Sequence, residues 1–89
     1  MEVKIINYLQ DNKGYGITIS EIGGTEKVLA NMSYNQDTDE NWIEIKGYNE
    51  FQEMDKYIFY LNDIIYIDED VTNMTVFSKE NKIIIENWE

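Results

Sequence analysis

The sequence predicts a mainly β protein, an antiparallel sheet or a small barrel or sandwich built from hairpins, with one short helix near residues 50–56. Apolar residues make up 43% of the chain, and the prominence of Ile, Tyr, Val and Phe among them favours strands. They occur in short runs between turn residues, which is the pattern of antiparallel hairpins. With 89 residues and no linker or repeat, a single domain over residues 1–89 is expected, with α+β as the alternative class.

A first hairpin is predicted near the start of the chain. Residues 3–9 and 17–22 form its strands, and the segment QDNKGYG between them is rich in Asn and Gly, which tolerate turn conformations. The following segment, TEKVLANMSYN, admits two interpretations. Thr25 could cap a short helix, or residues 28–34 could form a strand, and we favour the strand.

The middle of the chain contains one clear strand and one ambiguous segment. NWIEIKGY alternates, with Trp42 and Glu44 on one face and Ile43 and Ile45 on the other, so one face of this strand is expected to be wet. After it, apolar residues recur at helical spacing behind Asn49, a possible N-cap, but β-branched and aromatic residues are dense there. A short helix over residues 50–56, followed by strands that meet at a turn over residues 62–63, reconciles the two patterns.

A last hairpin is predicted from residues 74–78 and 82–88, which flank the polar loop KENK. The run IIIENW in its second strand indicates that both faces are at least partly covered. This strand is therefore expected inside the sheet or against a second layer.

The net charge of −11, with no arginine, argues against nucleic acid and against an anionic membrane as direct partners. It favours a basic protein surface instead, because opposite fields raise encounter rates. No apolar run is long enough for a signal peptide or a membrane span, and cysteine is absent. We expect a cytoplasmic protein, acting in the cytoplasm of a host cell.

Catalysis is not expected, because the chain has no histidine and no cysteine, and so lacks the commonest general base, nucleophile partner and metal ligands. No cofactor or metal is expected either. Asp37, Asp39 and Asn41 match the first positions of an EF-hand loop, but Trp42 replaces its glycine and Tyr48 its bidentate glutamate.

Acidic residues are concentrated in one part of the chain, since residues 37–70 contain eleven Asp and Glu against two lysines. A solvated loop is the simplest interpretation, but solubility needs less charge than this. In strands, carboxylates two residues apart, as in Asp37 with Asp39 or Asp68 with Asp70, would form rows that resemble phosphates. The predicted partner-binding residues, with Trp42 and Tyr66 as aromatic anchors, are Asp37, Asp39, Glu40, Trp42, Glu44, Tyr66, Asp68, Glu69 and Asp70.

The stretch YNQDTDENWIEI, with Thr38-Asp39-Glu40-Asn41 at its centre, resembles the acidic segment of the phage uracil-DNA glycosylase inhibitors. By type, the small size, strong acidity and lack of cysteine are also similar to phage anti-defence proteins, including anti-CRISPR proteins that imitate DNA. The resemblance implies an antiparallel sheet and a non-catalytic DNA mimic.

We therefore expect a non-catalytic acidic inhibitor, encoded by a phage as an anti-defence protein, that mimics DNA. It would block the nucleic-acid-binding surface of a basic host protein, such as a CRISPR effector or a DNA repair enzyme. Two other classes share parts of this signature. One is an immunity protein for a basic toxin, and the other is a small virion or assembly module whose sheet edges pair with copies of itself. The sequence leaves the target and the oligomeric state open.

Overall fold

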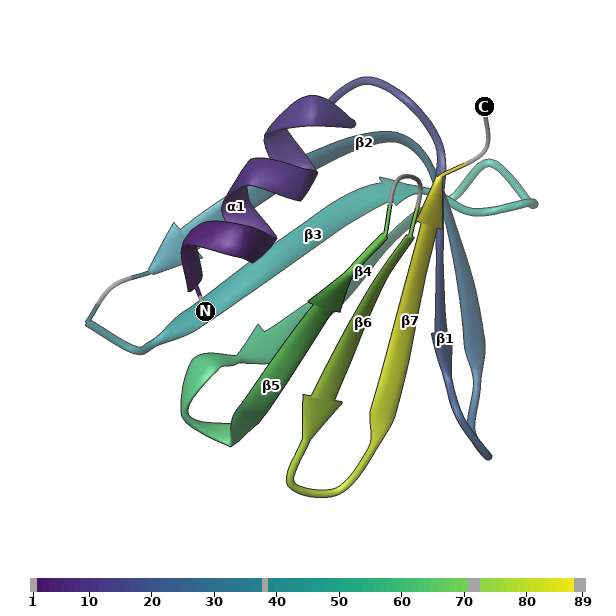
Figure 1. Cartoon of the computed structure of the whole chain (residues 1–89). Helices are drawn as coiled ribbons and strands as arrows, with labels where there is room; N and C mark the ends of the chain where they lie inside the picture. The colour runs from purple at the N-terminus through teal and green to yellow at the C-terminus, as the bar shows by residue number, and fades with distance from the viewer. Residues whose placement is uncertain (1, 38, 71–72, 88–89) are drawn as a thin grey trace.

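The computed structural model describes residues 2–37, 39–70 and 73–87, and it confirms a mainly β fold with one short helix (Figure 1). The helix comes first in the chain, and a 3₁₀ turn, η1 (Leu61–Asp63), separates the fourth and fifth strands. The elements are α1 (Glu2–Asp11), β1 (Ile17–Glu21), β2 (Glu26–Asp37), β3 (Trp42–Tyr48), β4 (Met54–Tyr60), β5 (Ile64–Glu69), β6 (Asn73–Ser78) and β7 (Lys82–Asn87).

The strands form one seven-stranded sheet in the order β4-β3-β2-β1-β7-β6-β5. Every pairing is antiparallel, and consecutive strands pair except β4 and β5. The last strand joins the first, so β7 lies inside the sheet as predicted, while β4 and β5 form its two edges. Figure 1 shows that the sheet is strongly curled, so that its edge strand β5 passes in front of the other edge strand, β4.

The curl depends on a bend in the long strand β2. Its first half pairs with β1 and its second half with β3, and the register shifts between Ala30 and Ser33, where Asn31 has a φ of 52°. A bulge of this kind bends a strand and increases its twist. Gly47 of β3 faces the bend, and a Cβ added there would lie 2.8 Å from the carbonyl oxygen of Ala30. The residue must therefore be glycine for the two strands to approach this closely.

The core lies between α1 and the concave face of the sheet. Ile5 and Leu9 of α1 are fully buried against apolar side chains from all seven strands. Asn12, which follows the helix, donates from Nδ2 to the carbonyl of Tyr8 at 2.8 Å and accepts from Asn87 Nδ2 at 2.9 Å. These bonds fix the end of the helix to β7.

Two polar contacts connect β4 to β1 and β2, with which it does not pair in the sheet. Lys27 Nζ of β2 lies 3.0 Å from Asp55 Oδ1 and 2.9 Å from the carbonyl oxygen of Lys56. The hydroxyl of Tyr57 donates to Glu21 Oε1 at 2.7 Å, and burial together with this carboxylate raises the pKa of Tyr57 above its ordinary value. Both contacts span positions that are distant in the sequence, so they stabilise the curl of the sheet.

Two sequence predictions were wrong. Residues 3–9, predicted as a strand, lie in α1, where Ile5, Tyr8 and Leu9 recur at three and four residues and face the core. Residues 50–56, predicted as a helix, form a turn and the start of β4. Asn49 does act as a cap, but its Oδ1 accepts from the backbone N–H groups of Phe51 and Glu53 and closes a turn.

The other strand predictions are confirmed. Residues 17–22 and 28–34 correspond to β1 and to part of β2, and the alternation that begins at Trp42 is that of β3, with its apolar side buried. The turn at residues 62–63 lies within η1. The final hairpin consists of β6 and β7, and residue 88, the predicted end of its second strand, falls outside the described residues. No helix in the described part of the chain is long and apolar enough to cross a membrane.

Candidate protein-interaction surface

The predicted partner-binding residues lie in two separate places. One group follows the hairpin between β2 and β3, and comprises Asp37, Asp39, Glu40, Trp42 and Glu44. The other lies on β5 and just after it, and comprises Tyr66, Asp68, Glu69 and Asp70. Figure 1 shows the end of β2 and the end of β5 well apart, so the two groups do not form one continuous acidic row.

In the hairpin group, Asp37 has a structural role. Its Oδ1 accepts from the backbone N–H groups of Asp39 and Glu40, each at 3.0 Å, and so closes the turn between the strands. Asp39 lies in that turn, so the expected row of Asp37 with Asp39 along a strand does not form. Asp39 and Glu40 are both exposed at the tip of the hairpin.

Glu44 is neutralised by neighbouring lysines. Its Oε1 lies 3.2 Å from Lys46 Nζ and its Oε2 lies 3.7 Å from Lys56 Nζ, while its side chain is only 13% exposed. Glu44 therefore does not present an uncompensated charge to a basic partner.

Trp42, the predicted anchor of this group, is half-buried between Asp37 on β2 and Tyr60 on β4.

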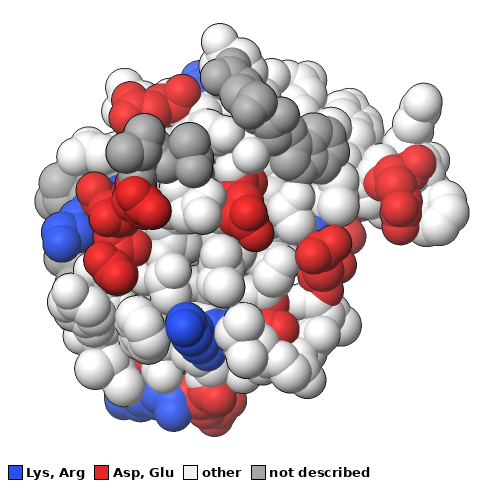
Figure 2. All heavy atoms as spheres, turned by 45° about the vertical axis from the view of Figure 1, so that its right-hand side comes forward, with Lys and Arg blue, Asp and Glu red and all other residues white. Residues whose placement is uncertain are grey.

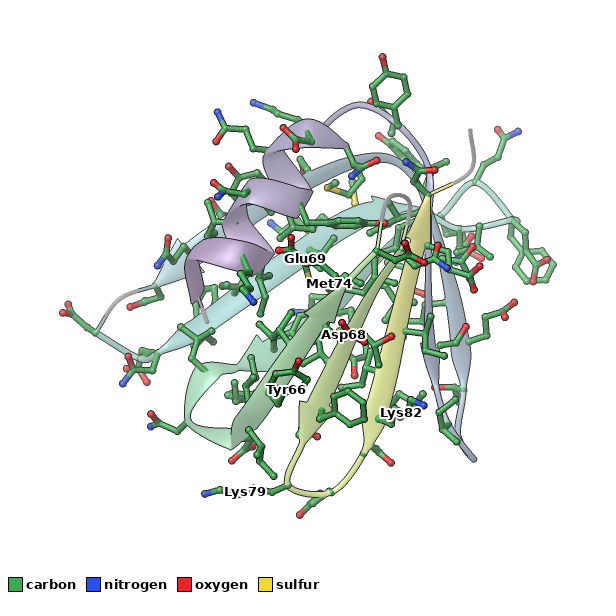
Figure 3. All side chains as sticks on the ribbon, viewed as in Figure 1. Tyr66, Asp68, Glu69, Met74, Lys79 and Lys82 are labelled. Carbon is green, nitrogen blue, oxygen red and sulfur yellow. The ribbon has the colours of Figure 1, made fainter. Side chains whose placement is uncertain are left out.

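On β5, the predicted anchor Tyr66 and the predicted acidic residue Asp68 lie on the outer face of the sheet. Tyr66 is 56% exposed, and its ring centroid lies 5.8 Å from that of Phe77 on β6. Asp68 is exposed one step further along, opposite Thr75. Figure 3 shows Tyr66 and Asp68 in sequence along β5, and Lys82 on the other side of β6, where it lies over the Phe77 ring at 5.5 Å.

The end of β5 meets the helix and forms what we call the acidic hollow. Asp11 of α1 comes together there with Glu69 and Asp70, and these residues line a depression of about 210 Å³ together with Asn7 and Tyr8. In Figure 3, Glu69 lies closer to the helix than Asp68 and Tyr66 do. Neither Asp11 nor Glu69 forms an ion pair with a lysine among the described residues. The fold thus gathers carboxylates from α1 and β5 in one place.

Tyr8, which lines the hollow, has a raised pKa. It is half-buried, and its hydroxyl donates to the carbonyl oxygen of Ile85 at 3.4 Å. Burial, and then the negative charge of Glu86 on β7, raise the pKa of Tyr8 to about 12. Glu86 on β7 therefore lies near enough to Tyr8 to add to the negative potential beside the hollow.

Sequence reasoning did not identify Asp11 or Glu86. Asp11 was expected in a loop after a strand, whereas in a helix it lies four residues after Asn7 and on the same face. Helical spacing in the first segment would have linked those two residues, but no local pattern links either of them to Glu69. Figure 2 shows acidic side chains in several groups over one face of the molecule, with lysines in smaller number.

The described residues include no group of three or more His, Cys, Asp or Glu side chains arranged to hold a metal ion. Comparison with known proteins gives no match to a protein family, to a curated protein or to a solved structure. The geometry of the chain itself is therefore the basis for a functional proposal.

Proposed function

We propose that the protein is a non-catalytic acidic inhibitor that binds the nucleic-acid-binding surface of a basic protein, as a phage-encoded DNA mimic would. The observation that supports this proposal is the acidic hollow, where Asp11, Glu69 and Asp70 converge from two elements. Two further carboxylates are exposed, Asp68 on β5 itself and Glu86 on β7, which β6 separates from β5.

Electrostatics supports an external partner for this region. Like charges brought together by folding oppose the compact state, and a chain with a net charge of −11 already exceeds what solubility needs. The lysine and arginine side chains that hold a phosphate backbone would lower this repulsion when they contact the hollow. Binding of this kind is fast, because opposite fields steer the encounter, and it weakens as salt screens the charges.

An aromatic anchor is available beside the carboxylates. Tyr66 presents half of its surface to solvent next to Asp68, and Phe77 supports its ring from β6. Tyrosine is over-represented among the residues that dominate binding energy, because it combines apolar area with a polar end. We assign Tyr66 as the anchor, with Asp68 beside it on the outer face and the hollow at the end of the same strand supplying negative charge.

The proposal is tested with two variants of equal net charge. The first, Asp11→Asn/Glu69→Gln/Asp70→Asn, neutralises the hollow, and the control, Glu50→Gln/Glu53→Gln/Glu80→Gln, neutralises three exposed carboxylates in turns outside it. Each immobilised protein is exposed to a bacterial lysate, and bound proteins are eluted with a double-stranded DNA oligomer and identified by mass spectrometry.

Wild type and control are expected to retain the same nucleic-acid-binding enzyme, released by DNA and by raising NaCl from about 50 mM to about 500 mM. The hollow variant is expected to bind that enzyme at least about tenfold more weakly, because close interfacial charge pairs contribute 1.5 kcal/mol or more each. Equal binding by both variants, or binding that salt does not weaken, would refute the proposal.

A further inference from the structure

The outer side of β3 and β4 differs from the rest of this acidic molecule. We call it the β3–β4 face and define it by Tyr48, Phe51, Met54 and Tyr60 together with Lys46 and Lys56. The four apolar side chains are 44%, 74%, 60% and 55% exposed, respectively. Tyr48 lies directly opposite Met54 on the paired strand, and Phe51 lies in the turn that joins the two strands.

The strand pair of this face has balanced charges. Lys46 and Lys56 flank one another across the strand pair, and both contact Glu44, which lies on the same side of the sheet. Nearby, the charge of Asp55 is offset by Lys27 at 3.0 Å. Only Glu50 and Glu53, exposed in the turn that holds Phe51, add uncompensated charge, so the face is much less negative than the chain as a whole, which has 7 lysines against 18 acidic residues.

We propose that the β3–β4 face is the interface of a homodimer, in which the same face of a second copy packs against it. Two molecules that each carry a charge of −11 repel one another, so association is favoured where the local negative charge is low and the exposed apolar area is large. A basic partner gains nothing from a face with two lysines. A second copy meets the same compensated surface and buries apolar side chains on both sides of a two-fold axis.

The available area is sufficient for a modest dimer. Fully buried aromatic side chains contribute about 150–250 Å² each, so the exposed parts of the four apolar residues supply about 450 Å² per copy. Two copies thus bury about 900 Å² from these side chains, and flanking residues bring the total near the lower limit of about 1,200 Å² for a specific interface. We expect a dissociation constant in the micromolar range.

The hollows on the β3–β4 face also fit the packing of this face against the same face of a second copy. A hollow of about 450 Å³ is lined by Met54, Asp55, Lys46 and Lys56, and another of about 380 Å³ lies beside Tyr48 and Ala30. In an isologous dimer, side chains that project from one copy enter the hollows of the other. The helix packs on the opposite, concave side of the sheet, so the acidic hollow beside it stays outside this interface.

Sedimentation velocity of the full chain, from about 2 to 500 µM, tests the dimer. We expect a reversible monomer–dimer equilibrium that tightens severalfold when NaCl is raised from about 0.1 M to 0.5 M, because salt screens the repulsion between the two acidic copies. Met54→Glu is expected to weaken the dimer at least about tenfold, since it places like charges at the interface. Phe51→Ala, which changes no charge, is expected to weaken it about threefold or more through lost apolar area.

Ile65→Glu is the matched control, because Ile65 is 62% exposed on β5 and the substitution changes the net charge equally. Its dimer constant is expected to stay within about twofold of the wild-type value. A monomer at every concentration, or a dimer that Ile65→Glu disrupts and Met54→Glu does not, would overturn the proposal. Circular dichroism confirms that each variant is folded, and the result does not depend on whether an inhibited enzyme is found.

Discussion

Gly47 is the residue on which the contact between β2 and β3 depends, and we expect Gly47→Ala to destabilise the protein. The new Cβ would lie 2.8 Å from the carbonyl oxygen of Ala30, 2.8 Å from Leu29 Cβ and 3.0 Å from the Leu29 carbonyl carbon. Carbon atoms in good contact are about 3.5–4.0 Å apart, so the strands must separate by several tenths of an ångström at the bend of β2. The atoms that the new Cβ would meet belong to the backbone of Ala30 and Leu29 or are the Cβ of Leu29, so no side-chain rotation can relieve these contacts.

The cost follows from two opposing effects. Overpacking of a buried site costs about 1–3 kcal/mol, whereas replacing glycine by alanine in extended backbone stabilises by about 0.4–1 kcal/mol through the unfolded chain. A net loss of about 1–2 kcal/mol remains, which lowers Tm by roughly 4–15 °C in a domain of this size. Urea denaturation followed by tryptophan fluorescence measures the loss.

Gly24→Ala serves as the comparison, because its added Cβ would lie 3.0 Å from Glu21 Oε2 and 3.2 Å from Glu21 Cβ, which are looser contacts than the two at 2.8 Å that Gly47→Ala would create. We expect its unfolding free energy to stay within about 0.5 kcal/mol of the wild-type value. If Gly47→Ala were as stable as the wild type, the close approach at the bend of β2 would not limit the fold, and this reasoning would be wrong.

Three further perturbations test other contacts. Asn12→Ala removes the bonds to Tyr8 and Asn87 and should cost about 1–3 kcal/mol in urea denaturation; an unchanged midpoint would show that the helix end is held by packing alone. Lys27→Ala should cost about 0.5–1 kcal/mol at neutral pH, and the difference from wild type should shrink as pH falls through the lowered pKa of Asp55; a difference of the same size in acid would contradict the ion pair. The pKa of Tyr8 is raised to about 12, so the folded protein keeps a proton that the unfolded chain loses near pH 10, and the unfolding free energy should be level below pH 10 and fall between pH 10 and 12. Tyr8→Phe should reduce that fall, and an equal fall in both proteins would exclude Tyr8 as its source.

Local patterns in the sequence were sufficient for most strands. Ile43 and Ile45 alternate with polar residues, and both are fully buried on the inner face of β3. The first segment was harder because it is short and apolar, and short apolar runs fit a helix as well as a strand. Only tertiary packing of Ile5 and Leu9 against the sheet distinguishes the two.

The candidate site was predicted in part, for a physical reason. The acidic character of Glu69 and Asp70 is visible in the sequence, but their proximity to Asp11 depends on how the helix packs against β5. Glu44 illustrates the opposite error. Its contact with Lys46 follows from spacing along one strand, whereas its contact with Lys56 requires the register between β3 and β4, which places Lys46 opposite Lys56.

The distribution of charge separates two kinds of association that salt affects in opposite directions. The acidic hollow has carboxylates that a basic partner would neutralise, so that complex should weaken as salt rises. On the strands of the β3–β4 face, Lys46 and Lys56 offset the charge of Glu44, so association there is limited by repulsion between the two acidic molecules and should strengthen with salt. If the β3–β4 face forms the dimer and the hollow binds a basic partner, each dimer presents two hollows. Its affinity for a partner with two basic sites should then exceed the affinity of the Met54→Glu monomer, because both sites can bind at once. A single-site partner should bind the wild type and Met54→Glu equally well, because the hollow lies outside the dimer interface.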